Sequence, residues 1–215
     1  SRALDNRRSQ VLEKLNVKVV SCQSCLLHDI ELLNLRKGYH SGYWGTVIPF
    51  RKACRAFLPR PPRPEDPSEL FERLDNVELP TLLPHSIPVE DLKIGRTESS
   101  SKWHAPILKR FPMSTDDAQR QMKAFFANGF GLYDECRNMA DQDMATSKLS
   151  VHLRFGTLSP LELYWKILDS DVEWEFKRVF ARRPFWRELA YYLLHTFPDM
   201  PVKSIREHYE KVEWE

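Results

Sequence analysis

Apolar residues recur at helical spacing near the start of the chain, and a β-branched run follows them. Val11, Leu12 and Leu15 lie among charged and polar side chains, which predicts a helix over Asn6–Leu15. The run Val17–Ser21 has the length and composition of a strand. A helix followed by a short strand is typical of an α/β layer protein. One such unit cannot cover both faces of a sheet. Two interpretations therefore stay open, a small α+β domain and the end of a larger parallel sheet, and we favour the second.

The second half of the chain has helical patterning throughout. Ser114 precedes an acidic first turn and Gly129 follows an apolar-periodic stretch, which predicts a helix between them. The Ser-Pro pair at 159–160 predicts another helix start. The longest helical pattern, from about 172 to 197, contains Pro184, which predicts a kink or a new helix start there. We therefore expect an all-α structure from residue 114 onward.

A proline-rich segment separates these two parts. Residues 58–101 combine closely spaced prolines with charged side chains, and such prolines disfavour regular helix and sheet. The interspersed leucines indicate a connection that lies along a surface and is not a free tether. The predicted fold is therefore α+β overall, in three parts. These are the end of a Rossmann-like α/β domain (1–57), a connector (58–113) and an incomplete helical domain (114–215).

Composition excludes several classes of protein. Of the 215 residues, 42% are hydrophobic and 12% aromatic, which is enough for a sizeable core and excludes global disorder. The net charge is only +2, so any contact with DNA has to come from a local patch. No apolar run approaches the roughly 18 residues of a membrane span, so we expect no membrane association.

The cysteines and the chain ends give weaker indications. Cys22 and Cys25 form a CxxC with His28 close behind, but no second ligand pair follows at the spacing of a zinc finger. We therefore expect no metal and ordinary intracellular thiols, with the compartment (nucleus, cytoplasm or plastid) open. The chain begins with Ser1 and stops at Glu215 without a terminating signal. We expect both ends to be cuts and the true N-terminus to be missing.

One polar string precedes a predicted helix. It consists of Thr146, Ser147, Lys148, Leu149 and Ser150. Hydroxyls and unpaired backbone N–H groups at such a place favour an anion, and a dinucleotide pyrophosphate would suit it. The same residue types are also common as simple helix caps. The residues alone leave both interpretations open.

The wider string TSKLSVHLRFGTLSP (146–160) resembles the flavin-binding signature of the photolyase and cryptochrome family. YDECR (133–137) resembles that family's Tyr-xxx-Arg, and FWRELAYYLLHTFPDMP (185–201) resembles its WREF-type helix with the turn that follows. The segments 1–20 and 42–54 resemble parts of its N-terminal α/β domain. These motifs occur in the family's order over essentially the whole chain, which is therefore identified as a member of this family.

The resemblance implies a cofactor and its ligands. An α/β domain would be followed by a helical domain that binds FAD, with the residues of Thr146–Ser150 on the FAD phosphates. Tyr133 and Arg187 would contact the same cofactor. An antenna pigment of the folate or deazaflavin type is expected only in a full-length parent. The later helices that complete the family's flavin pocket have no counterpart in this sequence, so we expect the isolated chain to bind FAD weakly or not at all.

The resemblance also implies DNA contacts. Arg137 would face a DNA phosphate, Trp186 would stack on a flipped pyrimidine dimer, and Trp214 would be an outer electron-transfer residue. Arg183 lies at the lesion-contacting position where dimer-repairing members usually carry Glu. Packing could also explain Tyr133 and Trp186, solvent exposure could explain Arg137, and a surface-anchoring role could explain Trp214, so these roles stay open.

Three functions are compatible with the sequence. The leading one is a blue-light-driven, FAD-dependent DNA photolyase, a carbon–carbon lyase that would act as a monomer on UV-damaged DNA. The second is a cryptochrome photoreceptor that signals through partner proteins. The third is a helical remnant that binds no FAD. The choice between cyclobutane and (6-4) lesions stays open.

Overall fold

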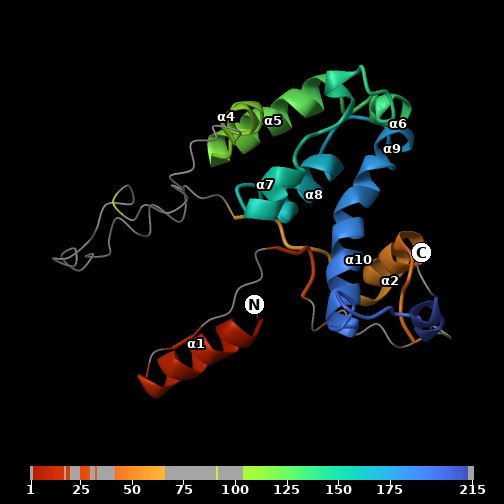
Figure 1. Cartoon of the computed structure of the whole chain (residues 1–215). Helices are drawn as coiled ribbons and strands as arrows, with labels where there is room; N and C mark the ends of the chain where they lie inside the picture. Colours follow the sequence, from red (N-terminus) through yellow and green to blue (C-terminus); the bar gives the residue numbers. More distant parts are fainter. Residues whose placement is uncertain are drawn as a thin grey trace. The chain divides into compact units, whose positions relative to one another are not determined.

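The computed structural model describes residues 2–16, 18–19, 25–29, 32, 42–65, 91 and 104–212. All regular secondary structure in these ranges is helical, and no strand occurs in them (Figure 1). The α-helices are α1 (Arg2–Lys14), α2 (Val47–Phe57), α4 (His104–Arg110), α5 (Thr115–Asn128), α6 (Tyr133–Cys136), α7 (Ser150–Phe155), α8 (Pro160–Leu168), α9 (Trp174–Lys177) and α10 (Arg183–Thr196). The 3₁₀ helices are η2 (Asp143–Ala145), η3 (Phe180–Arg182) and η4 (Glu207–Lys211). Within the described part, no helix is long and apolar enough to cross a membrane.

The helical part of the fold prediction is confirmed. Helix α1 includes all of the helix predicted over Asn6–Leu15 except its last residue, and residues 104–212 contain only helices and their connections. The strand predicted over Val17–Ser21 is not confirmed. Lys18 and Val19 are described and belong to no strand, and the other residues of this segment lie outside the described ranges. The α/β character expected for residues 1–57 therefore has no support in the described structure.

The chain divides into two compact units, which are described separately. One unit comprises residues 1–58 and 185–215, and the other comprises residues 59–184. The division falls within α10, between Pro184 and Phe185. These units reflect compactness alone, so the domain boundaries expected after residues 57 and 113 stay a prediction. Much of the expected connector lies outside the described residues.

The unit of residues 59–184 is built on an aromatic core. Phe125 of α5 is fully buried, and its ring centroid lies 5.0 Å from that of Phe180 and 5.9 Å from that of Phe130. Most pairs in this group are edge-to-face, an arrangement that aromatic quadrupoles favour. The core cluster is Ala118, Met122, Phe125, Phe130, Tyr133, Leu149, Leu158, Leu163, Ile167, Val179, Phe180 and Ala181. Because Leu149 belongs to it, the core also anchors the connection that leads into α7.

Helix α5 begins and ends at the predicted residues. The Ser114 hydroxyl accepts a hydrogen bond from the Asp117 N–H at 3.0 Å, and the Asp117 carboxylate accepts one from the Ser114 N–H. These two bonds form a capping box. The Ser114 hydroxyl also donates to the Asp117 carboxylate at 2.6 Å, and this bond, followed by that from the Ser114 N–H, lowers the pKa of Asp117. At the other end, a Cβ on Gly129 would lie only 2.1 Å from the carbonyl oxygen of Met144. Glycine is therefore required at this helix end by close backbone approach, since its own φ is −117°.

The described part of the proline-rich segment packs against α8. The indole Nε1 of Trp165 donates to the Pro62 carbonyl at 2.8 Å. The guanidinium groups of Arg60 and Arg63 lie 4.3 and 4.1 Å from the Trp165 ring centroid, within cation–π range. Arg63 also makes a two-pronged hydrogen bond to Asp169 at 2.8 and 2.9 Å. These contacts fix residues 60–63 to α8, whereas the leucines on which the prediction depends lie outside the described residues.

The start of α10 explains the proline within the longest helical pattern. The chain passes through α9 and η3, and α10 then begins at Arg183. Pro184 therefore lies in the first turn, where its missing N–H removes no intrahelical hydrogen bond. The predicted restart of the helix at this proline is confirmed.

The unit of residues 1–58 and 185–215 is held by contacts between α10 and the segment around α2. The rings of Phe50 and Tyr192 lie 5.3 Å apart, and those of Tyr43 and Phe197 lie 4.9 Å apart. The backbone N–H of Trp44 donates to the Tyr192 hydroxyl at 3.3 Å. Aromatic packing therefore connects residues about 150 positions apart in the sequence.

Candidate functional site

The predicted phosphate-binding string forms the bent connection between η2 and α7. Thr146 is extended, with φ −125° and ψ 148°, whereas Lys148 has a left-handed backbone with φ 55°. Left-handed backbone is uncommon outside glycine and is maintained only where surrounding contacts fix it. The Ser147 hydroxyl accepts a weak hydrogen bond from the Leu149 N–H at 3.4 Å. The string is therefore a defined turn that leads into the helix.

Buried neighbours fix this turn, and two of its three hydroxyl-bearing residues are exposed. Ala145 and Leu149 are 4% and 1% exposed. The Gln121 side chain of α5 donates to the Ser147 carbonyl at 3.0 Å. Thr146 and Ser150, in contrast, are exposed residues. The arrangement presents two hydroxyl groups to solvent from a backbone that the core holds in place.

A charged cluster borders the turn. The Asp143 carboxylate accepts hydrogen bonds from the Lys148 ammonium and from the Arg110 guanidinium, each at 2.5 Å. These bonds, with that from Lys148 the strongest influence, hold the pKa of Asp143 below its usual value. Two cations against one carboxylate leave a local charge of +1. The turn therefore combines outward hydroxyls with a weakly positive surrounding, which favours an anion.

The rest of the 146–160 motif has structural roles. Gly156 has φ 77° and ends α7 in the left-handed conformation that glycine adopts without strain. The Ser159 hydroxyl accepts a backbone N–H of α8 at 3.2 Å, and Pro160 is the first residue of that helix, as predicted. His152 is 3% exposed, and its Nδ1 lies 2.9 Å from the Thr157 hydroxyl oxygen. These residues fix the exit of α7 and the entry of α8.

Two further predicted site residues of this unit contact each other. Tyr133 is 7% exposed and packs edge-to-face on Phe180 at 4.8 Å. Its hydroxyl accepts a hydrogen bond from Arg183 Nε at 2.8 Å. The Arg183 guanidinium also lies 5.7 Å from the Tyr133 ring centroid. Both residues have a clear role in packing, and their cofactor and lesion contacts stay predictions.

Arg137 has an internal partner as well. Its guanidinium donates to the Asp134 carboxylate and, at 3.2 Å, to the Asp134 carbonyl. The side chain is 28% exposed. A contact with a DNA phosphate would therefore compete with this ion pair.

The remaining predicted residues belong to the unit of residues 1–58 and 185–215. Trp186 is 49% exposed, so its ring is open to solvent in this unit. Arg187 donates to the Cys25 carbonyl, and its guanidinium lies 5.2 Å from the Tyr191 ring centroid. Trp214 lies outside the described residues, so its electron-transfer role is untested.

Sequence reasoning missed a buried carboxylate in the same unit. Glu188 is fully buried and accepts hydrogen bonds from the N–H groups of Leu27 (2.8 Å) and His28 (3.2 Å). His28 Nδ1 also lies 3.2 Å from it. Burial of the Cys54 thiol, and second to it the nearby charge of Glu188, raises the pKa of that thiol to about 12. Helical spacing could have indicated that Glu188 is buried, because residue 188 lies on the same face of the helix as the buried positions 185, 189 and 192.

The metal prediction is not tested by this arrangement. Among the described residues, no three His, Cys, Asp or Glu side chains converge on a possible metal position. Cys22 of the CxxC lies outside those residues. Cys25, Cys54 and Cys136 form no disulfide in the described structure.

Comparison with known proteins identifies two similar proteins, and both are photolyases. No family model matches the sequence. The chain is 25% identical over 214 residues, or 99% of its length, to a deoxyribodipyrimidine photo-lyase of Agrobacterium fabrum (strain C58 / ATCC 33970). This relative and the solved structure described next are both photolyases, and together they support membership of the photolyase/cryptochrome family over nearly the whole chain. Its fold matches the crystal structure of a bacterial class III photolyase from Agrobacterium tumefaciens with a TM-score of 0.80, at 24% identity over 99% of this chain. The chain spans 42% of the length of each of these photolyases.

Proposed function

We propose that this chain is part of a light-driven DNA photolyase and supplies the phosphate-binding turn of its FAD site. The observation that carries this proposal is the match of 99% of the chain to a deoxyribodipyrimidine photo-lyase. Members of a fold family can differ in function, so the site residues have to support the same chemistry.

The turn Thr146–Ser150 fits the phosphates of a dinucleotide. Thr146 and Ser150 are exposed, and hydroxyl groups donate hydrogen bonds to phosphate oxygens. The Lys148 and Arg110 cations outweigh the Asp143 carboxylate by one charge, so a dinucleotide pyrophosphate would meet a favourable potential. Buried neighbours already hold the turn, which lowers the entropy cost of binding.

FAD supplies such an enzyme with photoinduced donation of an electron to a pyrimidine dimer. The residues of this chain would position the reactants. The half-exposed indole of Trp186 offers an apolar platform on which a pyrimidine dimer, flipped out of the duplex, could stack. Arg137 would hold a DNA phosphate once its guanidinium exchanges Asp134 for that partner. The substrate would be UV-damaged DNA.

The alternatives receive less support. Both relatives described above are photolyases, and no observation on this chain favours a photoreceptor. Arg183 stands where dimer-repairing members usually carry Glu, and its hydrogen bond to Tyr133 gives it a packing role in this chain.

The test begins with FAD binding by the chain. We would titrate FAD into the purified protein, follow the quenching of flavin fluorescence, and compare Thr146→Val and Ser150→Ala with the parent. Each removed hydroxyl takes away one hydrogen bond to a charged phosphate, so Kd should rise by about tenfold or more. The matched control is Thr115→Val, an exposed threonine beside another helix start, which should leave Kd unchanged.

Repair activity forms the second part of the test. Protein that retains FAD would be illuminated with blue light in the presence of a UV-irradiated thymine oligonucleotide, and loss of dimers would be measured by chromatography. Light-dependent loss supports the lyase. Equal FAD affinity in the Thr146, Ser150 and Thr115 variants would remove the phosphate assignment, whatever the outcome of the repair assay.

A further inference from the structure

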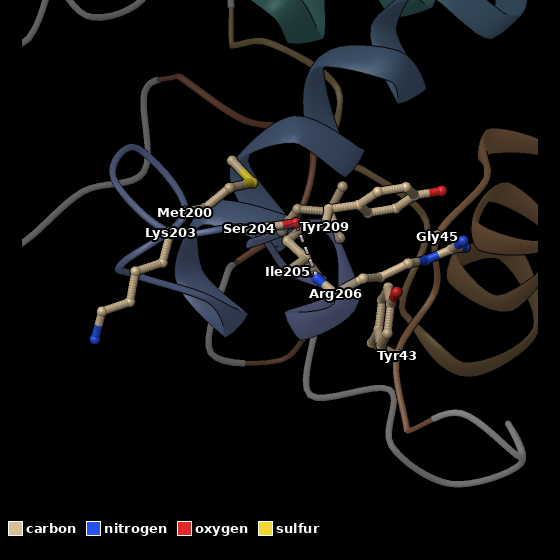
Figure 2. Close-up of a pocket in the computed structure, with 9 residues that line it drawn as sticks. Tyr43, Gly45, Met200, Lys203, Ser204, Ile205, Arg206 and Tyr209 are labelled. Carbon is tan, nitrogen blue, oxygen red and sulfur yellow. Dashed lines mark hydrogen bonds between the residues drawn. The ribbon is translucent and has the colours of Figure 1, made fainter. Parts of the chain in front are cut away.

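A hollow opens beside the C-terminal loop of the unit formed by residues 1–58 and 185–215. Its walls come from α10, the loop 200–206, η4 and the segment around Tyr43 and Gly45 (Figure 2). Its volume is about 430 Å³. This volume lies within the range of about 300–1,000 Å³ that is typical of small-molecule sites. None of the residues assigned above to FAD or DNA lines it.

Apolar and aromatic groups make up most of its wall. Leu193, Met200 and Ile205 contribute aliphatic surface. The rings of Tyr43 and Tyr209 lie on opposite sides of the Arg206 side chain (Figure 2). A planar ring would find flat aromatic faces and aliphatic contacts here, which is the usual lining of a ligand pocket.

The charged residues that line this hollow, among the side chains that the structure describes, are cations. They are Arg206 and Lys203. Hydrogen bonds between the Arg206 guanidinium and the hydroxyls of Tyr43 and Tyr209 raise the pKa of Arg206. Within the side chains that the structure describes, no carboxylate forms an ion pair with Arg206. A guanidinium has five N–H donors, so two phenol acceptors leave donors for an anion.

The other cation makes a weaker contribution. The Lys203 ammonium lies 3.6 Å from the Asp199 carboxylate, and both side chains are largely exposed. An exposed pair of this kind is worth little, so Lys203 can turn toward a bound anion at small cost. Arg206, which the two tyrosines orient, is therefore the main anchor.

A second hollow beside the same loop provides an internal comparison. It has a volume of about 630 Å³ and shares Met200, Lys203, Ser204 and Ile205 with the first. Its wall also contains the acidic residues Asp199 and Glu210 as well as Lys211. Charges of both signs and the absence of tyrosine make it a poor site for an aromatic anion. The two hollows therefore differ in the features that selective binding needs.

We propose that the hollow around Arg206 binds a small planar aromatic anion. The acidic group, a carboxylate or phosphate, accepts hydrogen bonds from the Arg206 guanidinium. The ring packs against the tyrosines and the aliphatic wall. This site is independent of the proposed FAD turn, since it shares no residue with it.

The test uses three probes on the purified 215-residue chain. 1-Naphthyl phosphate carries both a ring and an anion, 1-naphthol carries only the ring, and inorganic phosphate only the anion. Isothermal titration calorimetry should give 1-naphthyl phosphate an affinity at least about tenfold above either partial probe, because only that probe uses both parts of the site. Equal affinity for either partial probe, or no binding of 1-naphthyl phosphate, would overturn the proposal.

Variants locate the binding in this hollow. Arg206→Met should weaken 1-naphthyl phosphate by about tenfold or more, and Arg206→Lys by less. Lys211→Met is the matched control, because it removes one positive charge from η4, the helix that Arg206 directly precedes, and Lys211 lines only the second hollow. Equal weakening by the Arg206 and Lys211 variants would show non-specific attraction and refute the site.

A second variant keeps the test valid if Arg206→Met fails to fold. Arg206 bonds the two tyrosines, so Arg206→Met could lower stability, which circular dichroism would show. Lys203→Met is an exposed substitution that leaves those bonds intact, and it should weaken 1-naphthyl phosphate by about two- to fivefold. Thr146→Val should leave this affinity unchanged. An effect of Thr146→Val as large as that of Lys203→Met would place the probe at the FAD turn and overturn the proposal.

Discussion

Replacing Glu188 with alanine should strongly destabilise the unit of residues 1–58 and 185–215. The fully buried carboxylate accepts two backbone N–H groups, from Leu27 and His28, and lies 3.2 Å from His28 Nδ1. Alanine would leave these donors without an acceptor in a site closed to water. Each orphaned buried donor costs about 1–3 kcal/mol, so loss of the two backbone hydrogen bonds should cost about 2–6 kcal/mol.

The isosteric variant separates hydrogen bonding from cavity formation. Glu188→Gln keeps the side-chain shape and one carbonyl oxygen, but its amide N–H₂ then faces a second donor. One backbone N–H then loses its acceptor and faces the amide N–H₂ of the glutamine, so the free energy of unfolding should fall by about 1–3 kcal/mol. If the cavity were the whole effect, Glu188→Gln would behave like the parent.

Urea denaturation followed by circular dichroism measures these costs, with Glu210→Ala as the control. Glu210 is an exposed glutamate of the same unit, and its substitution should stay within about 0.5 kcal/mol. Amide hydrogen exchange gives a local reading, because the Leu27 and His28 amides should lose protection in Glu188→Ala. A cost below about 1 kcal/mol for Glu188→Ala, or unchanged protection of these two amides, would refute the reasoning.

Three further outcomes follow from other contacts. Gly129→Ala places a methyl group 2.1 Å from the Met144 carbonyl oxygen and should lower the free energy of unfolding, measured in urea, by about 1–3 kcal/mol. Gly131→Ala, whose methyl group would have no atom within 4 Å, should not lower it, and equal effects of the two variants would contradict the reasoning. Tyr133→Phe removes the acceptor of a guanidinium hydrogen bond and should lower the free energy of unfolding by about 1 kcal/mol, and no change would exclude that bond. Burial raises the pKa of Cys54 from 9.0 to about 12, so its contribution is complete below pH 9 and declines as pH rises toward 12, at about 1.4 kcal/mol per unit. Cys54→Ala should remove that decline, and identical pH profiles of stability in parent and variant would disprove it.

Local signals predicted the helix ends correctly. Ser114 caps α5, Pro160 begins α8, and Pro184 lies in the first turn of α10. Each of these depends on a few neighbouring residues, and the backbone chemistry of serine and proline is the same in any fold. Gly129 was also predicted as a helix end, but the reason differs. The carbonyl of Met144 approaches Gly129 closely, and the residues around Gly129 in the sequence do not predict that contact.

Contacts between distant residues were not predictable in this way. Arg183 and Tyr133 are 50 positions apart, and Glu188 and Leu27 are 161 apart. A charged residue is expected at the surface, so the identity of Glu188 alone predicts exposure. Only its position on the apolar face of the helix indicates burial. The family resemblance assigned roles to Tyr133 and Arg183 through FAD and DNA. The structure adds that they also stabilise each other.

The packing role of these two residues determines which residues can test the function. Tyr133 is a core residue, Leu149 is 1% exposed, and Arg183 bonds the tyrosine, so substitution of any of them changes packing as well as any ligand contact. Loss of FAD binding in such a variant would therefore not distinguish an altered site from an altered core. Thr146 and Ser150 are exposed on a turn that its buried neighbours hold, so their hydroxyls can be removed while the fold is kept. Substitutions at these two residues therefore test the FAD assignment more directly than any change at Tyr133 or Arg183.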